Sequence, residues 1–356
     1  MSMSTRGMWV VRTSITSPSA VERIVEIASR HQINTLVAQV RGRGDAYYLN
    51  GLEPLADALA DAPHFDPLAE LIRRTAGSDI RVHAWLNAHF AWEGPGQPQS
   101  PRHLVNLHPE WLMRRADGRV ASAGAECEGA YTCPSNLDAR QHLAAVYLDV
   151  ARRYSVDGIQ FDYIRYPSGD YCYCDSCSFR FREYLRWWDP ESDAVTDADL
   201  KDLPLRELTA RHQPEWDRFR RTQISELVRQ VYRNMKAEKP EVLVSAAVFA
   251  NTDDAYRSRF QDWKSWLAED NLDVVCPMAY TTDGSLFTAQ IKEAVDASRG
   301  SKPVWAGIGA YRLDSSDCAD RIARAEDAGA AGFLLFSYGA MTNEGASEDY
   351  LAGLDG

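Results

Sequence analysis

Residues 157–177 read DGIQFDYIRYPSGDYCYCDSC, and this stretch joins a buried strand to a cysteine-rich loop. Its first residues alternate, so that Gln160 and Asp162 share one face while apolar residues occupy the other, which is the period-two pattern of a β-strand. The run breaks at residues 167–170 (PSGD), which have loop chemistry. The stretch therefore places Asp162 at the C-terminal end of a strand and three thiols just beyond it.

Similar strand-like runs recur along the whole chain, and amphipathic helix-like segments alternate with them. The predicted strands are 7–15, 34–43, 81–88, 157–166, 241–250, 272–280, 302–311 and 331–340. The predicted helices are 19–31, 66–77, 138–154, 215–238, 286–299 and 316–329. Regular alternation of this kind predicts a parallel sheet, and eight strands favour a closed (β/α)8 TIM barrel over a doubly wound sheet.

The length of 356 residues exceeds that of a typical domain, but barrels reach it when their loops carry insertions. We expect a single domain over residues 1–356. Two connections, 89–137 and 168–214, are far longer than the usual few residues, and both leave strand C-termini, where barrel enzymes build their sites. We expect them to form walls over the barrel mouth, with the acidic segment 189–204 as a solvated excursion.

Composition limits the partners of this protein. Charged residues number 39 Lys and Arg against 51 Asp and Glu, and the net charge of −12 argues against nucleic acid, whose phosphates are bound by cationic side chains. The sequence has no apolar run of membrane-spanning length and no signal-peptide pattern. We therefore expect no membrane partner and a cytoplasmic location, with a secreted protein trimmed of its leader as the alternative. The sequence predicts no particular oligomeric state.

The predicted barrel mouth is rich in aromatic, amide and cationic side chains. If alternate strand residues face the barrel axis, Gln39 and Arg41 share that face on one strand, and His83, Trp85 and Asn87 share it on the next. Sugars offer apolar faces to aromatic rings and hydroxyl groups to planar polar groups. Each residue alone is more simply a core or rim residue, but together they predict a carbohydrate site. The candidate binding residues are Arg12, Gln39, Arg41, His83, Trp85, Asn87, Tyr163, Arg165, Tyr166, Tyr280 and Trp305.

Asp162 is the strongest catalytic candidate, because it lies at a strand exit beside Arg165 and two tyrosines. The alternative is an aspartate that only pairs with Arg165 or caps the loop. Glycoside hydrolysis normally uses two carboxylates. We predict Asp283 as the partner, because it follows Tyr280 closely; the other carboxylates that follow predicted strands are Asp45, Glu93, Asp253 and Asp254.

The chain has seven cysteines, an odd number that fits poorly with a disulfide framework. Cys172, Cys174 and Cys177 offer three soft ligands in one loop, and tetrahedral zinc takes four. Cys133 and Cys127 in the preceding long connection are both available as the fourth. Four thiolates would make a closed, structural zinc site that clamps the two long connections together. A redox pair is the alternative, although that usually calls for Cys-x-x-Cys at a helix start.

Several motifs carry a resemblance to known families. The chain resembles the family-10-like glycosyl hydrolases over nearly its whole length, in QVRGRGDAYY (39–48), HAWLN (83–87), HPEW (108–111), DGIQFDYIRYP (157–167), DWKSWL (262–267) and CPMAY (276–280). This resemblance implies a glycosidase acting on an oligosaccharide or polysaccharide. Separately, CPSN (133–136) and CYCDSCSFRFREYL (172–185) are similar to the zinc-binding segment of family 42 β-galactosidases. That likeness implies Cys133, Cys172, Cys174 and Cys177 as the ligands, with Cys133 in preference to Cys127.

The chain departs from both β-galactosidases and chitinases at their catalytic positions. The β-galactosidases end their fourth strand in Asn-Glu, where this chain has Asp162 and Tyr163, and VWAGIGAY (304–311) carries no carboxylate for their nucleophile. The terminal glutamate of chitinase-like barrels falls on Ile164. Neither catalytic pair transfers to this chain.

The leading functional hypothesis is a glycoside hydrolase that uses Asp162 and carries a structural zinc at the barrel rim. A non-catalytic carbohydrate-binding barrel is the alternative, since the family glutamates are missing. A metal-dependent amidohydrolase is disfavoured, because its first strand should carry His-x-His, where this chain has residues 11–13 (VRT).

Overall fold

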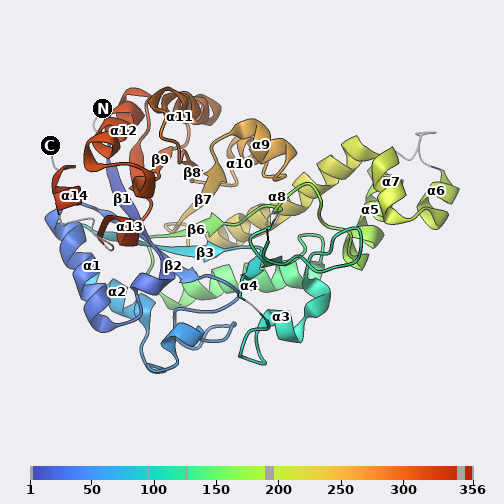
Figure 1. The fold of residues 1–356 in the computed structure, drawn as a ribbon, viewed down its shortest axis with the longest axis horizontal. Helices are drawn as coiled ribbons and strands as arrows, with labels where there is room; N and C mark the ends of the chain where they lie inside the picture. Colours follow the sequence, from blue (N-terminus) through green and yellow to red (C-terminus); the bar gives the residue numbers. More distant parts are fainter. Residues whose placement is uncertain (1–2, 95, 125–126, 189–195, 343–348, 355–356) are drawn as a thin grey trace.

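The computed structural model describes residues 3–94, 96–124, 127–188, 196–342 and 349–354 (Figure 1). Eight parallel strands close into a barrel in the order β1-β10-β9-β8-β7-β6-β3-β2. Their bounds are β1 Thr5–Val10, β2 Thr35–Arg41, β3 Arg81–Asn87, β6 Gly158–Asp162, β7 Leu243–Phe249, β8 Val274–Met278, β9 Trp305–Ile308 and β10 Gly332–Leu335. Seven of these strands lie within predicted runs, and β1 overlaps the eighth but begins two residues before it, so the TIM-barrel prediction is confirmed.

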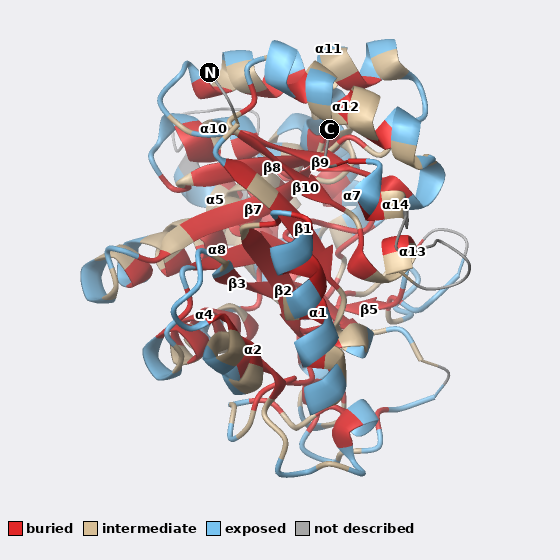
Figure 2. Cartoon of the chain, turned by 90° about the vertical axis from the view of Figure 1, so that its left-hand side faces the viewer, coloured by how far each residue is buried: buried red, intermediate tan, exposed pale blue. Residues whose placement is uncertain are grey.

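Helices surround the barrel and bury one face each against it. The six predicted helices are found as α1 Pro18–Arg30, α2 Pro67–Thr75, α4 Leu137–Arg153, α8 Gln213–Glu238, α11 Gly284–Ser298 and α12 Ser315–Asp327. Shorter helices are α3 Leu104–Leu107, α9 Thr252–Arg257, α10 Trp263–Ala268, α13 Tyr338–Thr342 and α14 Asp349–Ala352. Figure 2 shows the buried strands at the centre and the helices with their exposed faces outward. No helix in the described ranges combines the length and apolarity needed to cross a membrane.

Local sequence fixes where several of these helices begin. Ser17 and Asp66 each accept a backbone N–H of the following turn, and each is followed by proline, which is favoured at the first helical position. Asn136 caps α4 in the same way. These caps lie at the exits of loops, so they set the direction in which each helix returns along the barrel.

The two long connections hold structure of their own. The first contains β4 Phe90–Trp92 and β5 Ala130–Tyr131, which pair antiparallel. The second contains α5 Asp175–Trp188, α6 Asp197–Asp202 and α7 Leu205–Arg211, which the sequence analysis did not predict. Charged and exposed aromatic residues interrupt the apolar pattern of α5, which explains the miss. The predicted excursion 189–204 lies partly outside the described residues, and its described part includes the helix α6.

Apolar residues form two separate layers. The larger lies between the sheet and the helices, and the smaller fills the barrel interior. Trp9, Trp85 and Trp305 belong to the interior cluster, so the odd positions of β3 do face the axis as expected. The Trp9 indole donates to Gln160 Oε1 at 2.5 Å across the interior, which satisfies a polar group that burial would otherwise penalise.

A buried histidine lies low in this interior. His83 is fully buried, its ring meets Trp305 at a centroid distance of 5.4 Å, and neither ring nitrogen has a partner among the described residues. A Cβ at position 158 would lie 2.3 Å from His83 Nδ1, so this close approach requires Gly158. Burial lowers the pKa of His83 to about 4, with a smaller contribution from Arg81, because the interior disfavours the charged ring.

This histidine predicts a dependence of stability on pH. Because the pKa of His83 is lower in the folded state, unfolding takes up a proton between pH 6.5 and about 4. The contribution of His83 is complete above pH 6.5, and we expect about 3 kcal/mol of it to be lost as the pH falls through that window. Urea denaturation of His83→Leu should lack this loss. The exposed His64→Leu is the control, and an unchanged pH dependence in His83→Leu would contradict the prediction.

Candidate carbohydrate site at the barrel mouth

A pocket of about 560 Å³ opens at the carboxyl ends of the strands. Eight of the predicted site residues line it: Arg12, Gln39, Trp85, Asn87, Asp162, Tyr163, Arg165 and Tyr280. They come from segments far apart in the sequence, and the barrel register brings them together. Asn87 at the end of β3, for example, lies opposite Asp162 at the end of β6.

Asp162 is the buried carboxylate of this pocket, with a residue exposure of 7%. Its Oδ1 accepts the backbone N–H of Tyr163 at 2.6 Å and lies 3.5 Å from Arg165 Nη1. Burial raises the pKa of Asp162, and the opposing effects of Arg165, the Tyr163 N–H and the Trp85 indole do not cancel that rise. Asp162 therefore keeps its proton to a higher pH in this pocket than an aspartate does in water.

A chain of polar side chains lines the floor beside Asp162. Arg12 Nη1 donates to Gln39 Oε1 at 3.1 Å, and Gln39 Nε2 donates to Asn87 Oδ1 at 3.3 Å. Asn87 Oδ1 also accepts from Trp85 Nε1 at 2.9 Å. Such a chain fixes the orientation of each group before a ligand arrives, which reduces the entropy lost on binding.

Aromatic rings form the walls. Tyr280 stacks on Phe336 with centroids 5.4 Å apart. Opposite them, Tyr163 stacks on Phe90 with centroids 4.7 Å apart. The Arg165 guanidinium lies 4.0 Å from the centre of the Tyr163 ring. Tyr163 has a φ of 49°, a left-handed conformation that is strained for a tyrosine and that the surrounding contacts must hold. Flat rings beside planar amides are the surfaces that a sugar ring contacts.

Further carboxylates lie near Asp162. Glu93 lines the pocket and pairs with Arg12 at 3.0 Å. Glu128 accepts from Arg165 Nη2 at 3.4 Å and from the Tyr131 hydroxyl at 2.9 Å. Partial burial raises the pKa of Glu128, but Arg165, a backbone hydrogen bond and the Tyr131 hydroxyl together outweigh it, so the pKa is lowered. Arg165 thus lies between Asp162, whose pKa is raised, and Glu128, whose pKa is lowered.

Five predicted site residues lie outside the pocket lining. Asp283 is exposed and caps α11, where it accepts the backbone N–H groups of Ser285 and Leu286 at 2.8 and 3.1 Å, and these bonds lower its pKa. His83 and Trp305 lie deeper in the barrel, and Tyr166 is fully buried. Arg41 is fully buried as well. Trp305 belongs to the interior cluster and His83 meets its ring, so both lie on the predicted inward faces but below the pocket. The inward face predicted for Arg41 is wrong, because the pairing of β2 with β3 shifts register between Gln39 and Arg41, and Arg41 pairs with Glu53 instead.

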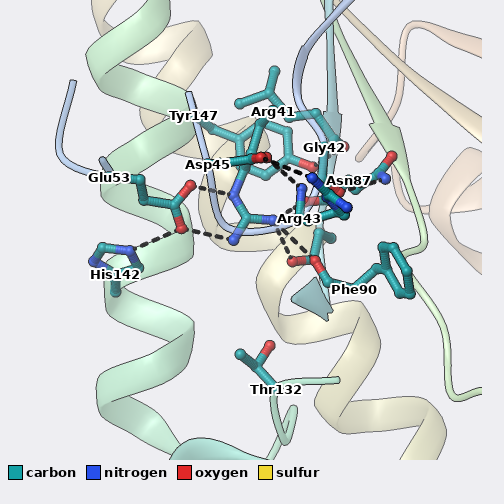
Figure 3. Close-up of polar contacts among 12 residues, drawn as sticks. Arg41, Gly42, Arg43, Asp45, Glu53, Asn87, Phe90, Thr132, His142 and Tyr147 are labelled. Carbon is teal, nitrogen blue, oxygen red and sulfur yellow. Dashed lines mark hydrogen bonds and ion pairs between the residues drawn. The ribbon is translucent and has the colours of Figure 1, made fainter. Parts of the chain in front are cut away.

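Arg41 holds the end of β3 in place (Figure 3). Its Nε and Nη2 donate to the two oxygens of Glu53 at 2.6 and 2.7 Å, and His142 of α4 contacts the same carboxylate at 3.2 Å. Its Nη1 donates to the carbonyls of Asn87 and Ala88. Glu53 raises the pKa of Arg41 against the opposing effect of burial. The ion pair therefore fixes the backbone that presents Asn87 to the pocket.

The four predicted cysteine ligands lie together beside the mouth. Cys133, Cys172, Cys174 and Cys177 are buried, and their Sγ atoms all lie within 4.8 Å of one another. All seven cysteines belong to the described residues and are free thiols. Two Sγ pairs are 3.4 and 3.5 Å apart, near the roughly 3.8 Å edge of a zinc tetrathiolate with bonds of about 2.3 Å.

The surroundings of the cluster also fit a metal. The backbone N–H of Arg114 donates to Cys172 Sγ at 3.3 Å, which is a common outer contact of metal thiolates. Cys127, the alternative ligand, donates instead to the carbonyl of Gly129 at 2.9 Å. The cluster therefore joins the segment that carries Cys133 to the start of α5, one contribution from each long connection.

The site also includes residues that the sequence analysis did not single out. Trp9 lines the floor, and Phe90 and Phe336 line the walls. Trp9 lies on the inward face of β1, and Phe336 directly follows β10. Strand alternation and position after a strand, which identified the predicted site residues, could therefore have identified these two as well. Glu93 was one of several alternatives, because chain position alone does not show which loop turns inward.

The fold and the pocket together define the class of this protein. It is a (β/α)8 barrel with a candidate carbohydrate site, formed by a buried carboxyl group and aromatic walls at the barrel mouth. The sequence model of the glycosyl hydrolase-like 10 family matches residues 4–314. The chain belongs to this family, and the resemblance drawn from its motifs is confirmed.

Individual relatives agree with this assignment. Glycosyl hydrolase YngK of Bacillus subtilis is 22% identical over 283 residues, so that the match covers 74% of this chain and 49% of YngK. The chain thus spans about half the length of YngK. The PgaB (BpsB) glycoside hydrolase domain of Bordetella bronchiseptica superposes with a TM-score of 0.70 at 15% identity, covering 98% of both chains. A GH42 β-galactosidase mutant from G. stearothermophilus gives 0.67 at 15%, covering 99% of this chain and 56% of the other. Both superpositions support the barrel fold.

Proposed function

We propose that the protein is a glycoside hydrolase that acts on an oligosaccharide or polysaccharide, with Asp162 as the proton donor. One observation carries the proposal: a buried carboxyl group with a raised pKa lies in a pocket whose other surfaces are aromatic rings and planar amides. A general acid must hold its proton near the working pH, and burial is the usual means.

The residues around Asp162 divide the remaining tasks. Asp162 donates its proton to the glycosidic oxygen, and Arg165 stabilises the carboxylate that forms. Glu128 positions Arg165 from the opposite side. Tyr163, Tyr280 and the amides of the floor hold the sugar rings and their hydroxyl groups.

We propose Glu93 as the second carboxylate, in place of the predicted Asp283. Glu93 lines the pocket with 44% of its side chain exposed, so it is open to a sugar or a water molecule. The Asp283 carboxylate is already occupied by two N–H groups of α11. A retaining or inverting mechanism requires a second carboxylate that faces the sugar.

We also propose that the cysteine cluster holds a structural zinc ion through Cys133, Cys172, Cys174 and Cys177. Four thiolates complete a tetrahedral shell, and the ion then supplies only cross-linking of the two long connections. The segment from Cys127 to Cys133 also carries Glu128 and Tyr131, so the clamp supports the partners of Arg165.

Elemental analysis checks the metal. We expect about one zinc ion per chain in purified protein and its loss in Cys174→Ser, because three thiolates bind much more weakly than four. Cys127→Ser is the matched control and should keep its metal. Four readily alkylated thiols and no metal in the wild type would contradict the assignment.

The function itself is tested by reducing-end release from soluble polysaccharides. We expect release by the wild-type protein on at least one neutral polymer. Binding of a polymer without release under any condition, from the wild type, would support the carbohydrate-binding alternative instead.

A further inference from the structure

A second hollow lies outside the barrel mouth, between α5 and α8. Its volume is about 280 Å³, and its lining includes Phe179, Glu183, Tyr184 and Trp187 of α5 with Phe219 and Gln223 of α8. We call it the α5–α8 groove. Trp187 is 74% exposed and Phe179 67% exposed, the two highest values among the large apolar side chains of the described ranges. Exposed apolar surface of this kind marks a contact site.

The opposite face of α5 explains why these rings are outside. Cys177, Phe181 and Leu185 follow one another at intervals of four, and all three are buried. The helix is therefore anchored through its inner face, with Cys177 belonging to the cysteine cluster. Phe179 and Trp187 lie on the outer face of α5, so they do not contribute to the packing that anchors the helix.

A buried polar atom in the same groove points to a ligand. Gln223 is only 4% exposed, and its Oε1 has no hydrogen-bond partner among the described residues. A buried amide oxygen that lacks a partner is costly. The oxygen is covered in this structure, and rotation of the amide toward the groove would let a donor there remove that cost. Glu183 adds a carboxylate, which already accepts from Arg186 Nη1 at 2.8 Å and from the Trp187 indole at 3.4 Å and has lone pairs left for a further donor. The groove thus offers flat rings together with acceptors for hydroxyl donors.

The groove lies at the same end of the molecule as the pocket. α8 leads into β7, so it runs back along the barrel and its N-terminal half lies beside the carboxyl ends of the strands. Phe219 and Gln223 belong to that half. Figure 1 shows α5 beyond this end of the barrel, alongside the start of α8. Both places therefore lie toward the carboxyl ends of the strands.

We propose that the α5–α8 groove is a second carbohydrate-binding site, which holds a polymeric substrate while the pocket acts on another part of the same chain. Trp187 stacks on a sugar ring, and Gln223 and Glu183 accept its hydroxyl groups. The inference rests on the proposed glycosidase function for its substrate class, but the groove binds without any chemistry.

Affinity electrophoresis tests the groove in the Asp162→Asn background, which prevents cleavage. The probes are hydroxyethyl cellulose, laminarin, xylan, galactomannan and glycol chitin. We expect retention by at least one polymer, and a dissociation constant about 2- to 12-fold higher after Trp187→Ala, the range for loss of one aromatic contact. Tyr256→Ala removes another exposed ring, 43% exposed on α9, and should leave retention unchanged.

A second variant guards against a folding effect. Gln223→Leu keeps the volume and removes the unpartnered oxygen, so we expect weaker retention with no fall in the urea midpoint. With otherwise wild-type protein, Trp187→Ala should raise KM for the polymer and leave hydrolysis of a trisaccharide unchanged.

The outcomes separate the two proposals. Retention that Trp187→Ala weakens, without cleavage by the wild-type protein, would overturn the glycosidase function and support the groove. Cleavage with unchanged retention and KM in Trp187→Ala would overturn the groove alone, as would wild-type protein that none of the five polymers retains. Loss of a dimer in Trp187→Ala, without loss of retention, would identify the surface as an interface between copies and also overturn it.

Discussion

Replacing Asp162 by asparagine is expected to lower the rate of glycan cleavage by about 10²- to 10⁴-fold, the usual contribution of a positioned acid. The amide keeps the shape of the carboxyl group and its bond with the Tyr163 N–H, so the fold and substrate binding should remain. The loss should therefore fall on kcat rather than KM. Initial rates of reducing-end release, with a urea midpoint for each variant, measure both.

The pH profile adds a second readout for Asp162. Burial raises its pKa, so the proton is retained to a higher pH than in a free aspartate, and activity should fall as the pH rises through that pKa. In Glu128→Gln, Arg165 no longer pairs with Glu128 and interacts more strongly with Asp162, which lowers the pKa of Asp162. The alkaline limb of the pH profile is therefore expected to move to lower pH in this variant. A profile that is identical in the two proteins would remove Glu128 from this role.

Two matched variants complete the test. Glu93→Gln should lose activity on a similar scale to Asp162→Asn if it is the second carboxylate. Asp283→Asn keeps a side chain that caps helices well, so stability and activity should both persist. Loss of activity in Asp283→Asn, with full activity in Glu93→Gln, would restore the pairing predicted from the sequence.

Replacing Arg41 by methionine is expected to destabilise the protein by about 3–5 kcal/mol, the cost of leaving one partner of a buried ion pair unpaired. Glu53 is fully buried, and Arg41 supplies two of its hydrogen bonds. Arg41 also lowers the pKa of Glu53 to about 2 against the opposing effect of burial. Guanidinium denaturation at neutral pH measures the change in the free energy of unfolding.

Two comparisons identify the cause of the Arg41 effect. Arg152→Met removes an exposed pair with Glu238 and should leave the free energy of unfolding almost unchanged, because solvent screens such pairs. Arg41→Met combined with Glu53→Leu should be more stable than Arg41→Met alone, because the unpaired buried charge is gone. If the double variant is the less stable, the loss comes from the carbonyl contacts at the end of β3 and not from the charge.

Periodicity in the sequence was sufficient for the barrel. Eight alternating runs predicted eight strands, because a strand repeats every two residues and its apolar face must be buried. The same periodicity did not show depth. His83, Trp85 and Asn87 share one face of β3, yet only the last two reach the pocket and His83 lies below them. Depth depends on the stagger between strands, which no single strand encodes.

Long-range partners show the same limit. Gln39 and Arg41 share a face in the sequence pattern, but the pairing of β2 with β3 shifts register between them. Gln39 therefore reaches the pocket, whereas Arg41 pairs with the buried Glu53. Asp283 and Glu93 both follow strands, but the first caps its own helix while the second turns into the pocket. Local spacing gave no means of separating them, because each outcome depends on a loop that spacing does not describe.

By itself, the sequence determined the strand order along the chain, the carboxyl group at the end of β6 and the four cysteines that cluster, because each depends on short-range pattern or on motif likeness. The tertiary structure alone decided which of the predicted residues meet, how deeply each is buried and that α5 carries an exposed aromatic groove. Those properties arise from contacts between segments distant in the chain, and burial, pKa and the choice of partner are all set by such contacts.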